Sequence, residues 1–182
     1  MKTVRGLPQL CALLVFWLGL IGSAVAMPAR NAPPVPELPA LGADAWINSA
    51  PLRLADLQGQ LVLIEFWTFG CANCLRSIPW VKSIAERFGP AGLQVIGIHT
   101  PEFSHERSAQ AVREQIKALA IRHPVMLDND YEYWNAMGNR YWPAFYLVDK
   151  QGRVRHAWAG EVRNGSRRGR LIQQAIEDLL AE

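Results

Sequence analysis

The chain has 182 residues, half of them hydrophobic and 19% charged, which suits one domain with a full core and is too short for two. Its formal net charge is +3 at pH 7, but two basic residues lie in an N-terminal leader, and the remaining 17 basic and 16 acidic residues nearly balance. A net charge of +1 gives no support to nucleic-acid binding, and none is predicted.

Residues 1–26 have the pattern of a secretory signal peptide. Lys2 and Arg5 form a positive region, residues 10–22 are apolar, and Ala24-Val25-Ala26 offers a small-residue cleavage site. The apolar stretch is short for a membrane span, which needs about 20 residues, so we expect cleavage rather than a retained membrane anchor. Cleavage would remove Cys11 and deliver the mature chain to the periplasm.

The prolines between residues 27 and 45 predict an extended tether, followed by one domain over residues 46–182. Residues 61–67 are too apolar for a strand with a wet face and are typical of a central parallel strand. We expect a short hairpin over 46–54 with its turn at Asn48-Ser49, and then a helical turn over 54–59. Strands follow over 61–67 and 93–99, with a helix over 73–88 between them, and then a helix over 108–120 and a strand over 125–127. The chain ends with a short helix over 130–137, a hairpin of 144–149 with 153–158, and a closing helix over 165–181. This order predicts a three-layer α/β/α sandwich.

Cys71 and Cys74 are the most informative residues of the chain. They follow the apolar strand directly and stand at the start of a predicted helix, whose N-terminus favours a thiolate at Cys71. The two-residue gap allows Cys74 to close a disulfide with it. A zinc site would need two more ligands, and the chain has no second cysteine pair, so we predict a redox site rather than a zinc site or a purely structural disulfide. No metal and no cofactor are expected.

Aromatic residues and one acid surround this pair in the sequence. Glu65 is the lone acid of the strand, and burial would raise its pKa and suit it to accept the proton of Cys74, unless it reaches solvent at the strand end. Trp67 and Phe69 would limit the access of water to the thiols and contact substrate, although simple core packing explains them equally well.

Two prolines are also informative. Pro79 lies inside the predicted helix, where it must kink or split it. Pro143 directly precedes a strand, and a cis Trp142–Pro143 bond would free the backbone of Trp142 to pair with an extended substrate, whereas a trans loop proline is the alternative.

The run Glu65-Phe66-Trp67-x-x-x-Cys71-x-x-Cys74, with Pro79 and Trp142-Pro143, resembles the thioredoxin superfamily. More narrowly, the chain from 46 to 158 is similar to exported thiol–disulfide oxidoreductases of the TlpA, ResA and redoxin type. The segments 67–74, 97–103, 127–130 and 138–143 look most like the thioredoxin-like domain of DipZ-type membrane electron carriers.

This resemblance implies a fold and a set of roles. Cys71 would be the attacking cysteine, Cys74 the resolving one, Glu65 the buried acid and Pro143 a cis-proline. Residues 104–125 would be a helix and strand inserted into the thioredoxin fold. The implied protein is a monomeric reductase of protein disulfides, supplied with electrons by a membrane partner of the CcdA or DsbD kind. Ala72-Asn73, between the cysteines, departs from the pairs of cytosolic thioredoxins and DsbA-type oxidants, so the direction of electron flow is implied by the resemblance alone.

Two other functions compete with this hypothesis. Thr68 and Cys71 have the Thr-x-x-Cys spacing of peroxiredoxins, but the proline that precedes this threonine in peroxiredoxins is missing. A Cu(I)-binding module that uses the two thiols is the other alternative, although no histidine lies near them in the sequence. His99 and Glu102, near the expected active edge, would assist proton transfer or substrate contact, or else merely end a strand.

Overall fold

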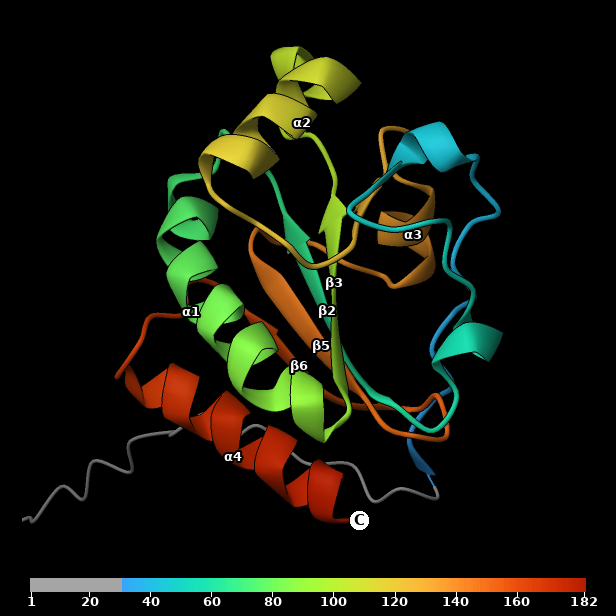
Figure 1. Ribbon diagram of the computed structural model, residues 1–182, viewed down its shortest axis with the longest axis vertical. Helices are drawn as coiled ribbons and strands as arrows, with labels where there is room; N and C mark the ends of the chain where they lie inside the picture. The colour runs from blue at the N-terminus through green and yellow to red at the C-terminus, as the bar shows by residue number, and fades with distance from the viewer. Residues whose placement is uncertain (1–30) are drawn as a thin grey trace, which may run out of the picture.

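The computed structural model describes residues 31–182, which form a six-stranded sheet with helices on both faces (Figure 1). The predicted signal peptide and residues 27–30 lie outside this range. The strands are β1 (Trp46–Ile47), β2 (Leu61–Trp67), β3 (Leu93–His99), β4 (Val125–Leu127), β5 (Ala144–Val148) and β6 (Val154–Ala159). The helices are α1 (Ala72–Phe88), α2 (Ala109–Ala118), α3 (Glu132–Ala136) and α4 (Arg167–Ala181), with short 3₁₀ turns at Ala43–Ala45, Leu54–Leu57, Gly89–Ala91 and Ser104–Arg107.

The sheet has the order β1-β4-β3-β2-β5-β6, with β2, β3 and β4 parallel and the other strands antiparallel to their neighbours. Helices α1 and α4 pack on one face through a core that includes Leu63, Val81 and Ile176. Helix α3 packs on the other face against Phe66. The alternation of side chains along β2 separates these two cores, because successive residues of a strand point to opposite faces. The predicted three-layer α/β sandwich is therefore confirmed.

Helix α2 and strand β4 form the additional unit expected between residues 104 and 125. In Figure 1, α2 lies beyond the carboxyl end of β3. Its buried residues Val112 and Ile116 join a third apolar cluster, which also contains both cysteines and Trp67. The inserted unit therefore completes the surroundings of the cysteine pair.

The short hairpin predicted over residues 46–54 does not form. Strand β1 instead pairs with β4, with Trp46 opposite Met126 and Ile47 opposite Val125. The side chain of Asn48, the expected turn residue, donates hydrogen bonds to the carbonyls of Ile121 and His123 at 3.0 and 3.1 Å. This two-residue strand gains its backbone hydrogen bonds from the distant edge of the sheet and not from a hairpin with the residues that follow it. Local sequence patterns cannot reveal such a distant partner.

Helix α1 runs as one element through Pro79, so the proline does not split it. The described part of the predicted tether is also packed rather than free. Val35 donates to the Gly152 carbonyl at 2.8 Å, and Leu38 is buried against the α3 face of the sheet. Apolar residues between the prolines explain this packing. Within residues 31–182, no helix has the length and apolar character needed to cross a membrane.

Candidate active site

The cysteine pair lies where the loop after β2 enters α1. Cys71 is the N-cap of the helix, and its sulfur accepts a hydrogen bond from the backbone N–H of Cys74 at 3.2 Å. The two sulfurs are joined as a disulfide. Cys71 is 8% exposed, whereas Cys74 is completely buried. A partner thiol can therefore reach only the sulfur of Cys71, and the helix N-terminus stabilises a thiolate there.

Glu65 is buried within the sheet and is 1% exposed, so the alternative in which it reaches solvent is wrong. Its Oε1 has no hydrogen-bond partner in the protein. On β5 it lies opposite the apolar Phe145, and on β3 opposite Gly97. Burial raises the pKa of Glu65 to about 8, because the charged form loses its hydration without gaining a partner. Glu65 is thus largely protonated near neutral pH.

The Trp142–Pro143 peptide bond is cis, and Pro143 is buried at the start of β5. The indole N–H of Trp142 donates to the Thr100 carbonyl at 3.0 Å, and its ring lies 4.1 Å from that of Trp134. Trp142 also packs against the cluster that contains Cys71. These contacts hold the loop before β5 beside the cysteine pair.

A second buried acid, Glu106, holds the cysteine loop to the loop after β3. Its Oε1 accepts hydrogen bonds from the Thr68 hydroxyl and the Gly70 N–H, both at 2.5 Å. Its Oε2 accepts from the N–H groups of Glu102 and Phe103 at 2.6 and 2.7 Å. Burial opposes the charge of Glu106, but these four hydrogen bonds outweigh it and lower the pKa of the carboxyl below its usual value. Only an ionised carboxylate accepts four such bonds.

His99 extends this network beneath the cysteine loop. Its Nε2 lies 3.3 Å from the Thr68 hydroxyl, which already donates to Glu106, so the ring nitrogen is the donor. The ring stacks on Phe69 and meets the edge of Trp67. Burial lowers the pKa of His99 to about 4, despite the charge of Glu106, which raises it. His99 is therefore neutral at physiological pH.

Sequence reasoning missed Glu106. It considered His99 and Glu102, which lie at the expected edge, but Glu106 stands in a short 3₁₀ turn of a charged segment, where acids are common. Nothing in its spacing from Gly70 indicates a contact across 36 positions. The structure does explain the glycine before Cys71, since a Cβ at Gly70 would collide with the Glu106 carboxylate.

Aromatic rings lie on the cysteine loop and on the loops after β3 and before β5. Phe103 is 51% exposed and Tyr141 is 61% exposed. Phe69 and Trp142 are partly buried and pack against the cluster that contains both cysteines. A Cβ on Gly70 would lie 3.2 Å from the Phe103 ring, so this ring borders the cysteine loop. Trp67, which was predicted to contact substrate, is completely buried and presents no surface to one.

The arrangement of these residues agrees with a family comparison. The model of the AhpC/TSA family matches residues 34–157. The chain belongs to the AhpC/TSA family. The match covers the sheet from the proline-rich segment to β6, including both cysteines.

Individual relatives support this membership. DipZ from Mycobacterium tuberculosis is 43% identical over 123 residues, which are 66% of this chain and 18% of DipZ. The thiol-disulfide oxidoreductase YkuV from Bacillus subtilis is 30% identical over 149 residues, which are 82% of this chain and 95% of YkuV. The solved structure of a DsbF homologue from Corynebacterium diphtheriae has a TM-score of 0.71 at 21% identity, covering 88% of this chain and 96% of that one. The resemblance to thioredoxin-like oxidoreductases is thus confirmed, and the chain spans less than a fifth of DipZ.

Proposed function

We propose that this protein is a thiol–disulfide oxidoreductase that reduces protein disulfides through Cys71 and Cys74. The observation that carries the proposal is the asymmetry of the pair at the N-terminus of α1. Cys71 caps the helix and keeps 8% of its surface exposed, whereas Cys74 is completely buried. The similarity to the thiol-disulfide oxidoreductase YkuV supports this class of reaction.

The reaction has two exchange steps. In the first, the Cys71 thiolate attacks one sulfur of a substrate disulfide, so that a Cys71–substrate bond forms and the other substrate sulfur leaves as a thiolate. In the second, Cys74 loses its proton and attacks Cys71, which releases the second substrate sulfur and closes the Cys71–Cys74 disulfide. Two electrons pass to the substrate in total.

Glu65 is the proposed acceptor of the Cys74 proton. Its raised pKa lies close to that of a thiol, so the transfer costs little free energy in either direction. In the disulfide form described here, Glu65 is the group that holds the proton. Cys71, Cys74, Glu65 and Pro143 are the residues that we propose to carry the reaction, with Pro143 setting the loop beside Cys71.

The substrate would bind as an extended segment over the exposed rings beside Cys71. Phe69 and Trp142 offer apolar contact, and the backbone of Trp142 would pair with the segment as a strand does. We further propose that the mature protein acts as a monomer in the periplasm and is reduced again by a membrane donor of the CcdA or DsbD type. The pattern of residues 1–26 and the family resemblance support these assignments.

The test is covalent capture. Cys74→Ser should accumulate a mixed disulfide with its substrates because the second exchange step is blocked, whereas Cys71→Ser should not. Non-reducing electrophoresis and mass spectrometry identify the captured proteins and the cysteine that holds them. Equal capture by both variants would overturn the assigned roles.

The competing functions predict other results. A peroxidase would consume hydrogen peroxide rapidly without an added disulfide, but here the Thr68 hydroxyl is committed to Glu106 rather than to a peroxide at Cys71. A Cu(I) module would bind copper stoichiometrically without reducing insulin disulfides. Among residues 31–182, no three or more His, Cys, Asp or Glu side chains are grouped to hold a metal.

A further inference from the structure

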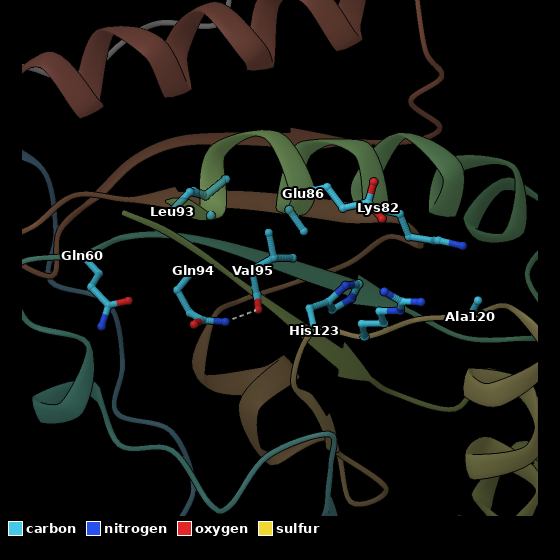
Figure 2. A pocket seen from close by; sticks show the side chains of 11 residues that line it. Gln60, Lys82, Glu86, Leu93, Gln94, Val95, Ala120 and His123 are labelled. Carbon is cyan, nitrogen blue, oxygen red and sulfur yellow. Dashed lines mark hydrogen bonds between the residues drawn. The ribbon is translucent and has the colours of Figure 1, made fainter. Parts of the chain in front are cut away.

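A cavity of about 330 Å³ lies between α1 and the first half of β3 (Figure 2). Strand β4 pairs with β3 only from Gly97 onward, so the edge of β3 before Gly97 has no neighbouring strand on this side. Lys82 and Glu86 of α1 form one wall of the cavity, and Arg122 and His123 of the loop before β4 form another. The proposed reaction makes no use of this space.

Three buried polar atoms without a partner in the protein belong to residues that lie beside Gly97 or opposite it in the sheet. They are Oε1 of Glu65, Nε1 of Trp67 and Nε2 of His123. Glu65 lies directly opposite Gly97 on the neighbouring strand. A Cβ at Gly97 would lie 3.0 Å from the Trp67 nitrogen and 3.5 Å from the His123 nitrogen. Buried polar atoms with no protein partner are as a rule hydrogen-bonded to water, so this cluster can hold a water path.

His123 connects this cluster to the cavity. Of its two ring nitrogens, only Nε2 is both buried and without a partner, and the ring lines the cavity, as Figure 2 shows. On its other side Glu65 faces the apolar ring of Phe145, which offers a proton no exit. The polar route from Glu65 to the surface therefore runs past Gly97 to His123.

The charges around the imidazole keep it neutral. Burial and, to a smaller extent, the positive charge of Lys82 lower the pKa of His123 to about 4. Glu86 and Arg122 also line the cavity, and Glu65 of β2 lies opposite Gly97. A neutral imidazole accepts a proton at one nitrogen while it releases one from the other, so it can pass protons without staying charged.

We propose that His123 relays the proton of Glu65 to the solvent in this cavity. The proposal rests on the proposed function, in which Glu65 receives a proton from Cys74 in each cycle. That proton leaves the Glu65 oxygen through water to His123 Nε2, while the proton on Nδ1 passes to solvent, and no electrons move. In this proposal His123 does not contact the reacting sulfurs. It acts only through Glu65, by taking up the proton that Glu65 releases.

The test replaces the relay while keeping a polar side chain. His123→Gln retains hydrogen-bonding groups but cannot exchange a proton between two nitrogens. We expect it to slow the second exchange step roughly tenfold or more in stopped-flow fluorescence and to leave attack by Cys71 unchanged. His156→Gln is the matched control, because His156 is also partly buried with an unpartnered nitrogen, but lies on β6 away from Glu65.

Chemical rescue separates a relay from a structural role. His123→Gly enlarges the cavity, and added imidazole should restore the rate of the second exchange step in proportion to its concentration. Imidazole should not change the rate of this step in the Glu65→Gln protein. An unchanged second step in a folded His123→Gln protein, or no rescue of a folded His123→Gly protein, would overturn the proposal.

One readout does not depend on activity. The indole N–H of Trp67 lies on the same path, so its exchange with solvent, followed by NMR, should slow about tenfold or more when His123→Phe closes the path with an apolar ring. If Cys74→Ser captures nothing, the proposed function fails, and this exchange rate still decides whether the path exists. Equal exchange in the wild-type and His123→Phe proteins would refute it.

Discussion

The burial of Glu65 predicts a pH-dependent loss of stability that one substitution should remove. In the unfolded chain the carboxyl loses its proton near pH 4.5, whereas in the folded protein it keeps the proton until about pH 8. Between these values the folded state binds more protons than the unfolded state. The free energy of unfolding therefore falls as the pH rises, and the stabilisation is complete only below pH 4.5.

The size of the effect follows from the pKa difference. At about 1.36 kcal/mol per unit, the rise from 4.5 to about 8 corresponds to about 5 kcal/mol lost above pH 8. In Glu65→Gln the side chain at this position does not titrate. The free energy of unfolding of this variant should therefore change with pH as that of the wild type does, apart from the contribution of Glu65. For a urea dependence of about 2 kcal/mol per M, the wild-type midpoint should fall by about 2 M relative to the variant across this range.

The assay is urea unfolding of the oxidised protein between pH 4.5 and 9, followed by tryptophan fluorescence. The disulfide keeps both cysteines from titrating. The histidines titrate equally in both proteins, so the difference between the two curves isolates Glu65. If the curves stay parallel from pH 5 to 8, the carboxyl ionises normally in the folded protein and the argument from burial is refuted.

The network around Glu106 and His99 yields three further predictions. Glu106→Gln should lower the free energy of unfolding by about 3 kcal/mol or more, because the new amide group would face two N–H or O–H donors. Thr68→Val removes one donor and no charge, so it should lower the free energy of unfolding by only about 1–2 kcal/mol. Equal losses in urea titrations would count against the carboxylate network. Gly70→Ala should cost about 1–3 kcal/mol through its collision with Glu106 and should slow alkylation of reduced Cys71 by iodoacetamide, and an unchanged alkylation rate would show that the loop adjusts freely. In NMR titrations the His99 ring should stay neutral from pH 8 down to about 5. The stability that depends on its neutral form should be lost as the pH falls from 6.5 toward 4. A titration midpoint near pH 6.5 would contradict the burial of this ring.

Local patterns were sufficient for the central sheet and for the reacting pair. The apolar run of β2 and the two cysteines after it predicted a buried strand that ends at a helix N-cap, and the lone acid in that strand predicted a buried carboxyl with a raised pKa. These features depend on neighbours in the sequence. The period of the apolar residues and the backbone of a helix N-terminus indicate these features from local sequence, and packing of the segments then produces the burial itself.

Long-range contacts escaped prediction because their free energy comes from partners that the sequence does not place together. Strand β1 pairs with β4 about 80 positions away, and Val35 bonds to Gly152 across the sheet edge. The carboxylate of Glu106 meets four donors only after the loop that follows β3 folds back over the cysteine loop.

The sequence by itself indicated the residues that we propose to carry the chemistry: a cysteine pair at a helix N-terminus, with an acid in the strand before it. Only the tertiary structure decided how that chemistry is arranged. It buries Cys74 behind Cys71, directs Glu106 to the cysteine loop, and places His123 near Glu65 across Gly97. The reason is physical, because residue identity sets the intrinsic reactivity of a group, whereas burial and hydrogen-bond partners arise only when separate segments pack together.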